Sequence, residues 1–252
     1  MMRREYKYRV PVSKLDEMRK ALEPFVKQDV FMELGQNNEY TVRSIYYDSP
    51  TMTYYKEKIH GLKNRKKVRV RGYNLQDDES VVFLEVKRKD NEHISKNRCP
   101  VSYSDIDKVF ETKSPDYYVL DGNGKPEYVE DGKKFFYHII KKSLNPVVLI
   151  VYEREAFYSK FDKSLRITFD KNLRYHYQPD MNDLYSDSQL KNVLNQYFVL
   201  EIKFEKGYPV WLQKIVQQFG LKRTSVSKYQ ISLDDELKKD NKQNYFINNR
   251  TV

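Results

Sequence analysis

The stretch KVRVRGY at residues 67–73 alternates between cationic and aliphatic side chains. Lys67, Arg69 and Arg71 fall on one face of a period-two strand, whereas Val68 and Val70 fall on the other. A half-buried strand usually mixes polar residue types on its outer face, but each charged position here is a cation. The direction in which this charged face points therefore decides both the fold and the chemistry of the chain.

Similar alternation predicts further strands along the chain. With 66–73, the expected strands cover residues 4–10, 41–48, 81–89, 94–101, 147–157, 164–170 and 198–205. One such charged face is often simply solvated, but its repetition on seven strands favours an interior that the strands share.

Helical patterns lie between these strands. Ser13 and Asp16 form a candidate capping box before an apolar helical face, and Pro209 and Gly220 bound another predicted helix. Helical spacing also appears over residues 104–112 and 133–144. We expect one domain over residues 1–237, followed by a polar tail over residues 238–252.

The helices need an apolar surface to cover, and the aliphatic faces of the strands provide one. About eight strands can close into a barrel that has an inside. With helices on the outside, the charged faces would line that inside. The sequence therefore predicts an α+β fold in which a closed antiparallel β-barrel of about eight strands forms a charged tunnel, with helices packed outside.

The predicted interior holds more cations than acids. Unpaired charges in an enclosed space would cost several kcal/mol each, so we expect a polyanionic ligand. Arginine suits phosphate because its planar guanidinium binds two oxygens at once, and the remaining acids suggest a divalent metal, Mn²⁺ or Mg²⁺, on the phosphates. The four acids are Glu5, Glu85, Asp170 and Glu201, and the nine cations are Lys7, Arg69, Arg71, Lys87, Lys96, Arg98, Arg154, Arg166 and Lys203.

The composition of the chain excludes or disfavours several classes of protein. The chain has 252 residues and a net charge of +10, and its single cysteine, Cys99, excludes an internal disulfide. The sequence contains no apolar run long enough to span a bilayer, no signal-peptide core and no glycine-rich phosphate loop, so we expect a cytoplasmic protein without direct membrane insertion. Nucleic-acid binding is disfavoured because bases would not fit a lumen filled with side chains. The four histidines show no metal-ligand spacing.

Nine short motifs, in order along the chain, resemble the VTC domain, the polyphosphate polymerase domain of the vacuolar transporter chaperone complex. That domain belongs to the triphosphate tunnel metalloenzyme (CYTH-like) superfamily. The resemblance spans about residues 3–233. The motifs are EYKYRV at 5–10, SIYYDSP at 44–50, VRVRGY at 68–73, FLEVKRK at 83–89, SKNR at 95–98, YEREAF at 152–157, LRITFD at 165–170, LEIKF at 200–204 and SVSKY at 225–229.

The resemblance implies roles for individual residues. Glu201 would hold the divalent metal, with Glu5 or Glu85 as the next candidates, and Tyr152 and Ser227 would add hydroxyl donors. The superfamily's opening E-x-E-x-K pattern has Arg3 in place of its first acid. That change disfavours a two-metal hydrolase, which needs more carboxylates. The implied phosphate-gripping cations are Lys7, Arg69, Arg71, Lys87, Lys96, Arg154, Arg166 and Lys228.

The favoured function is a polyphosphate polymerase that moves the γ-phosphoryl group of ATP onto a growing chain, with Lys87, Arg154 and Arg166 neutralising charge beside Glu201. A triphosphate or polyphosphate hydrolase of the same fold, with Glu85 as a free base, is the first alternative. A non-catalytic polyphosphate-binding module is the second. Any regulation or coupled translocation would need a membrane partner that the chain does not identify.

Overall fold

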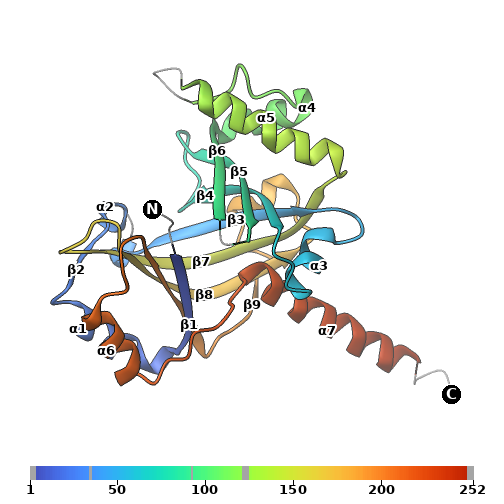
Figure 1. Ribbon diagram of the computed structural model, residues 1–252. Helices are drawn as coiled ribbons and strands as arrows, with labels where there is room; N and C mark the ends of the chain where they lie inside the picture. The colour runs from blue at the N-terminus through green and yellow to red at the C-terminus, as the bar shows by residue number, and fades with distance from the viewer. Residues whose placement is uncertain (1–3, 34–35, 92, 121–124, 249–252) are drawn as a thin grey trace. The chain divides into compact units, whose positions relative to one another are not determined.

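The computed structural model describes residues 4–33, 36–91, 93–120 and 125–248. Over these ranges the chain forms an α+β fold with one large antiparallel sheet and helices (Figure 1). The strands are β1 (Arg4–Pro11), β2 (Val26–Gln28), β3 (Tyr40–Asp48), β4 (Arg65–Tyr73), β5 (Val81–Asp90), β6 (His93–Ser102), β7 (Asn145–Ser159), β8 (Arg166–Tyr177), β9 (Lys191–Asn192) and β10 (Tyr197–Phe204).

The helices are mostly short. Short 3-10 turns cover Val12–Lys14, Gln36–Asn38, Tyr103–Asp105 and Met181–Tyr185. No described helix is both long enough and apolar enough to cross a membrane. The α-helices are α1 (Leu15–Leu22), α2 (Val30–Glu33), α3 (Thr53–Ile59), α4 (Ile106–Thr112), α5 (Pro126–Lys141), α6 (Val210–Gln218) and α7 (Lys228–Asn248).

The strand order along the hydrogen-bonded sheet is β1-β10-β8-β7-β3-β4-β5-β6, with β2 on β7 and β9 on β8. In the described part of the chain β6 does not pair with β1, so the closed barrel expected from the sequence is not confirmed. All eight expected strands are present, and most are longer than expected by one or two residues at an end. The largest difference is β8, which continues to Tyr177 instead of ending at 170.

The chain divides into two compact units. Unit 1 contains residues 1–42, 151–173 and 194–226, and unit 2 contains residues 43–150, 174–193 and 227–252. The strands β3, β7 and β8 each contribute residues to both units.

In unit 1, β1, β10 and β8 bury their apolar faces under α1 and α6. Trp211 is partly buried against this core and stacks on Phe25 with ring centroids 4.5 Å apart. Burial at this scale stabilises by about 1.5–3 kcal/mol per large side chain, and it fixes which residues face the other side. The core residues include Tyr8, Val10, Met18, Leu22, Leu165, Ile167, Phe169, Leu200, Ile202, Phe204, Leu212 and Ile215.

In unit 2, β4, β5 and β6 pair antiparallel, and α5 packs against β5 and β6 (Figure 1). Leu84 lies opposite Cys99 and Val70, and all three are fully buried, which agrees with a packing role for Cys99. Lys67, Arg69, Arg71 and Lys87 consequently project to the opposite face of these strands. The alternation predicted from the sequence is thus confirmed in both strands.

Two local expectations are wrong. Helix α1 begins without a side-chain cap, because Ser13 lies within the preceding 3-10 turn, so the capping box does not form. Helix α5 begins at Pro126, where proline suits the first helical turn, instead of at residue 133. Residues 238–248 continue helix α7, and residues 249–252 of the expected tail lie outside the described residues.

Gly132 lies where α5 packs closely against Pro115 and Cys99, so a larger residue at this position should change the stability of the protein. A Cβ at this position would lie 2.7 Å from Pro115 Cγ and 2.9 Å from Cys99 Sγ, which is too close for either atom. Gly132→Ala should therefore lower the free energy of unfolding by about 1–3 kcal/mol, although alanine normally favours a helix over glycine. Urea unfolding measures the change. Gly207→Ala, where no atom lies within 4 Å, is the control, and equal effects of the two substitutions would contradict the proposed packing.

Candidate functional site

The residues predicted from the sequence form two clusters, one in each unit. We call the first the Arg154 cluster and the second the Glu85 cluster. The Arg154 cluster of unit 1 contains Glu5, Lys7, Asp29, Tyr152, Arg154, Arg166, Asp170, Glu201 and Lys203. The Glu85 cluster of unit 2 contains Tyr46, Lys67, Arg69, Arg71, Glu85, Lys87, Lys96 and Arg98.

The pairing of β1 with β10 builds one side of the Arg154 cluster. Lys7 lies directly opposite Glu201, and Glu5 lies directly opposite Lys203. Lys7 Nζ is 2.8 Å from Glu5 and 3.1 Å from Glu201, and Lys203 also pairs with Glu201. Burial would lower the pKa of Lys7, but Glu201 and Glu5 outweigh it and hold that pKa well above its usual value. Lys7 is therefore charged at every physiological pH.

Arg154 is buried on β7 and fixed by a carboxylate on β8. Its Nε and Nη2 donate to the two oxygens of Asp170 at 2.6 and 2.8 Å, and Nη2 also donates to Tyr152 Oη at 3.1 Å. Burial opposes the charge, but Asp170 and Tyr152 raise the pKa of Arg154 well above its usual value. The guanidinium is thus held in one orientation before any ligand binds.

Arg166 is held by two groups that the sequence analysis did not identify. Its Nη2 donates to Asp29 at 2.8 Å and to Tyr40 Oη at 3.1 Å, and Asp29 is buried between β2 and α2. Arg166 Nε and the hydroxyl of Thr168, which is also on β8, are buried and have no hydrogen-bond partner among the described residues. Buried donors of this kind are suited to a ligand oxygen.

Glu85 is the buried centre of the second cluster, with 1% of its side chain exposed. Arg69 pairs with one carboxylate oxygen at 2.6 Å, while Lys96 at 2.6 Å and Arg98 at 3.2 Å pair with the other. Burial would raise the pKa of Glu85, but Arg69, Arg71 and Lys96 hold it well below its usual range. Glu85 is therefore not the free carboxylate that the hydrolase alternative requires.

The register of three strands places like charges side by side. Lys67 on β4 lies opposite Lys87 on β5, and Lys87 lies opposite Lys96 on β6. In the next row of the same face, Arg69 and Arg98 flank Glu85. Like charges directly opposite one another destabilise a sheet, so this row favours a bound anion. Lys87 is partly buried within it.

Tyr46 on β3 belongs to this cluster, although sequence analysis gave it no role. Its hydroxyl accepts a hydrogen bond from Arg69 Nη1 at 2.7 Å, and Lys67 and Arg69 lie over its ring. Burial would raise the pKa of Tyr46, but Arg69, Lys67 and Arg71 outweigh burial and lower that pKa to about 7. The only sequence signal was its place in the SIYYDSP motif at 44–50, between Ser44, which accepts from Arg71 Nε, and Asp48.

Ser227 directly precedes α7, and Lys228 is the first residue of this helix. Lys67 Nζ donates to Ser227 Oγ at 3.1 Å. The following Tyr229 donates its hydroxyl to buried Asp48 at 2.6 Å and stacks on Tyr46 at 5.2 Å. Asp48 thereby fixes the start of α7 relative to the Glu85 cluster.

The described residues contain no group of three or more histidine, cysteine or acidic side chains that could hold a metal by themselves. Glu5 and Glu201 nevertheless converge on one cation, Lys7 Nζ. Magnesium commonly uses one or two carboxylates and takes its remaining ligands from phosphate and water. This donor pair therefore fits a divalent ion that arrives with a phosphate substrate.

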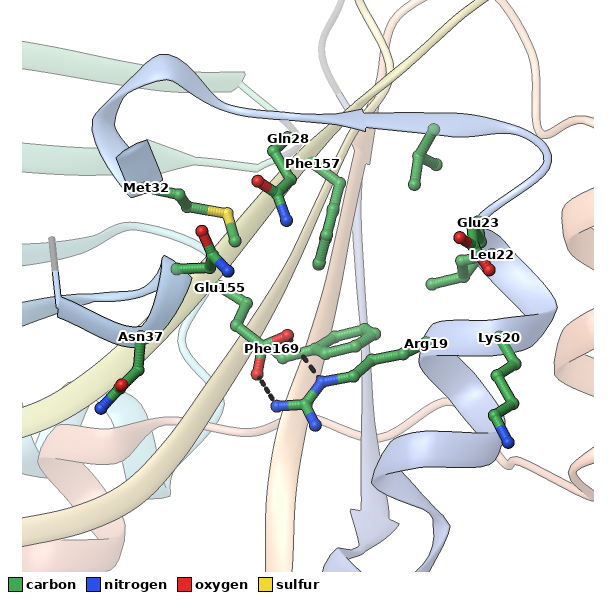
Figure 2. Close-up of a pocket in the computed structure, with 12 residues that line it drawn as sticks. Arg19, Lys20, Leu22, Glu23, Gln28, Met32, Asn37, Glu155, Phe157 and Phe169 are labelled. Atoms are coloured by element: carbon green, nitrogen blue, oxygen red, sulfur yellow. Dashed lines mark hydrogen bonds and ion pairs between the residues drawn. The ribbon is translucent and has the colours of Figure 1, made fainter. Parts of the chain in front are cut away.

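Unit 1 also has a cavity of about 480 Å³ beside α1, shown in Figure 2. None of the sequence-predicted site residues lines it. Phe157 and Phe169 form part of its wall, and Glu155 accepts two hydrogen bonds from Arg19 at its edge (Figure 2). Glu155 alternates with Arg154 along β7, so the two side chains point to opposite faces of the strand.

Comparisons with known proteins bear on the fold and the family. The family model described as "VTC domain" matches residues 2–235. No curated protein shows significant similarity to the chain.

Three solved structures resemble the fold distantly. A Pyrococcus horikoshii protein is 14% identical, with a TM-score of 0.46 over 93% of this chain and 99% of its own. A candidate adenylate cyclase from Bacillus halodurans is 12% identical, with a TM-score of 0.46 over 90% and 96%. A candidate adenylyl cyclase from Hippeastrum, described as having a dominant triphosphatase activity, is 12% identical, with a TM-score of 0.49 over 91% and 93%. Similarity at this level carries no argument about function.

Because Tyr46 changes charge near neutral pH, the affinity of the Glu85 cluster for an anion should depend on pH. Below about pH 7 its hydroxyl is neutral and the cations are available to an anion, whereas above that pH the phenolate neutralises one of them. Tripolyphosphate affinity should therefore fall as the pH rises above about 7, where Tyr46 ionises first and Lys96, whose pKa is lowered to about 8 by burial, loses its charge next. Isothermal titration calorimetry at several pH values measures this dependence.

The matched variants for this test are Tyr46→Phe and Tyr47→Phe. Tyr46→Phe should bind with a flatter pH dependence than the wild type. Tyr47 is the next residue on the strand, and burial raises its pKa far above neutral, so Tyr47→Phe should keep the wild-type dependence. Identical pH profiles for the wild type and Tyr46→Phe would show that Tyr46 stays protonated.

Proposed function

The chain belongs to the VTC domain family, and on that premise we propose that it is a metal-dependent polyphosphate polymerase that transfers the γ-phosphoryl group of ATP to a growing inorganic polyphosphate chain. The observation that carries the proposal is the Glu85 cluster, in which Lys67, Lys87 and Lys96 form a row of like charges beside a single buried acid. A chain of phosphates supplies closely spaced negative charges that match such a row. The charged tunnel predicted from the sequence is part of this proposal.

The two clusters suit different parts of phosphoryl transfer. In the Arg154 cluster, Arg154 and Arg166 are each held by a buried acid, so they can neutralise charge in the transition state without first reorganising. In the Glu85 cluster the cations outnumber the acid, so this cluster suits the binding of polymer. The acceptor oxygen belongs to phosphate, so the protein needs no nucleophilic side chain.

Glu201 and Glu5 are the residues that would hold Mg²⁺ or Mn²⁺. When bound, such an ion supplies charge neutralisation for the transferring phosphoryl group. Lys7 bridges both carboxylates and holds them in place. Lys203 holds Glu201 from the other side.

A hydrolase would instead need a base to activate water. Glu85 pairs with three cations and its pKa is strongly lowered, so it accepts a proton poorly at neutral pH. Incubation with ATP and Mn²⁺, followed by gel separation, tests the choice. ADP with polymer supports the polymerase, whereas ADP with free phosphate alone contradicts it.

Tripolyphosphate should raise the melting temperature of the protein, and added salt should weaken the effect. The physical reason is the repulsion among Lys67, Lys87 and Lys96, which a bound polyanion relieves in the folded state alone. Differential scanning fluorimetry at low and high salt measures both effects. A melting temperature that tripolyphosphate does not change would contradict an anion site at this cluster.

Glu201→Gln should abolish turnover but leave metal-free tripolyphosphate affinity unchanged or increased. The amide holds a divalent cation poorly, and it releases Lys7 and Lys203 from a competing carboxylate. Polymer formation and calorimetry measure the two effects separately.

Arg166→Ala is the contrasting variant, because it deletes a charge-assisted contact of about 1.5–3 kcal/mol and should lower affinity and rate together. Glu85→Gln is the matched acid variant and should change affinity without removing the metal ligand. Wild-type turnover in Glu201→Gln would show that the metal is held elsewhere.

A further inference from the structure

A second group of polar side chains lies on the other face of β4 and β5 in unit 2. Lys66 and Arg88 are direct cross-strand partners, and they alternate with Lys67 and Lys87 along their strands. Their side chains therefore project away from the Glu85 cluster. Helix α5 packs against β5 and helix α3 packs against β4, so His138 of α5 and Tyr54 of α3 reach this region.

Three buried polar atoms here have no hydrogen-bond partner among the described residues. They are Tyr54 Oη, Arg88 Nε and His138 Nε2. Tyr54 and His138 are only 4% and 5% exposed. Buried polar groups in folded proteins are nearly always satisfied by protein, water or a ligand, so three in one region indicate that something else binds them.

The surrounding charges are mostly positive. Burial, together with Lys66, Arg88 and Lys141, lowers the pKa of His138 to about 4, so its imidazole is neutral at pH 7. Burial, together with nearby acids, raises the pKa of Tyr54 to about 12, and Arg88 acts in the opposite direction. The positive charge of Arg88 therefore acts on both His138 and Tyr54.

The two acids near this group, Glu57 and Asp48, are already engaged. Asp48 accepts hydrogen bonds from the backbone N–H groups of Tyr54 and Tyr55, each at 2.9 Å. Glu57 accepts a hydrogen bond from the backbone N–H of Lys66 at 3.2 Å. Burial raises the pKa of Glu57, and the positive charges of Lys66 and Lys142 partly oppose that shift. Lys66, Arg88, Lys141 and Lys142 therefore outnumber these two carboxylates.

We propose that Tyr54, Arg88 and His138, with Lys66 and Lys141 around them, form a binding site for a small phosphate-class oxyanion on the face of β4 and β5 that α3 and α5 cover. Tyrosine Oη and arginine Nε are hydrogen-bond donors, and neutral histidine donates from Nε2 when its proton is on that nitrogen. One phosphate presents several acceptor oxygens together with the negative charge that the cations require. A water molecule has two lone pairs and no net charge. This site shares no residue with the Glu85 cluster, and it does not depend on the polymerase proposal.

The test is an NMR titration of the full chain, which observes the imidazole resonances and assigns that of His138 by its loss in His138→Gln. Orthophosphate is added against chloride at constant ionic strength. The His138 resonance should shift in a saturable way, and the pKa of His138 should rise because a bound anion stabilises the protonated ring. A His138 resonance that does not move with orthophosphate or with tripolyphosphate would overturn the proposal.

Matched charge variants separate a defined site from general screening. Arg88→Gln should weaken orthophosphate binding by about tenfold or more, the scale of one lost charge-assisted hydrogen bond. Lys133→Gln removes one positive charge from α5, the helix that carries His138. Because Lys133 pairs with Asp116 and Glu130, this variant should bind orthophosphate as tightly as the wild type. Equal weakening in the two variants would overturn the proposal.

The source of the oxyanion is distinguished by parallel titrations. Saturation with orthophosphate supports a site for the free ion. Saturation with tripolyphosphate alone, lost in Arg88→Gln, supports a site for a chain end. Tyr54→Phe should weaken either ligand several-fold while leaving the other imidazole resonances in place, because the deleted hydroxyl has no partner within the described protein.

Discussion

The arrangement of unit 2 depends on one constraint, which is that the apolar face of β4, β5 and β6 fixes their register. Val68, Leu84 and Val86 are fully buried, and burial of each such side chain contributes about 1.5–3 kcal/mol. A shift by one residue would expose all of them. Repulsion between neighbouring cations across a sheet costs less, about 0.2–1 kcal/mol per pair, so hydrophobic burial wins. The lysine row is therefore forced by the core that lies behind it.

In the Arg154 cluster, the positive charges are paired with carboxylates of the protein. Each of its arginines has a carboxylate of its own, Asp170 for Arg154 and Asp29 for Arg166, and Lys7 has two. Paired charges attract a polyanion less strongly, but they hold their donors in fixed positions. Fixed donors favour the stabilisation of developing charge, whereas the unbalanced row in unit 2 favours initial binding. The division of labour proposed for the two units follows from this difference.

The sequence predicted the strands well because a period of two is a local property. The eight expected strands all form, and in β4 and β5 the aliphatic positions are buried as the alternation predicted. The partners of the charges were not predictable in the same way. Asp29 holds Arg166 from a position 137 residues away, and Tyr46 lies in a motif to which the sequence analysis assigned no residue role. Glu85 could be identified as an acid on the charged face, but its three cationic partners depend on the register of three strands.

Local sequence patterns were poor predictors where a short segment could adopt more than one structure. Ser13 could cap a helix, but the chain forms a 3-10 turn there before α1. Residues 238–248 are polar enough to suggest a tail, yet they continue a helix whose first turns are anchored by Tyr229 and Asp48. The contact between Tyr229 and Asp48 is tertiary, and a pattern within one segment does not contain it.

The same alternation that produces the Glu85 cluster also explains why donors collect behind it. The apolar face of β4 and β5 ends at Val68 and Val86, and the next positions on that face are Lys66 and Arg88. Here α5 reaches its last turn, where the helix dipole favours cations such as Lys141. Because α5 and α3 cover this end of the strands, the donors become buried instead of solvated. A charged strand end beneath a helix must find an acceptor, and the folded chain does not supply one to Tyr54, Arg88 Nε or His138 Nε2 within its described residues.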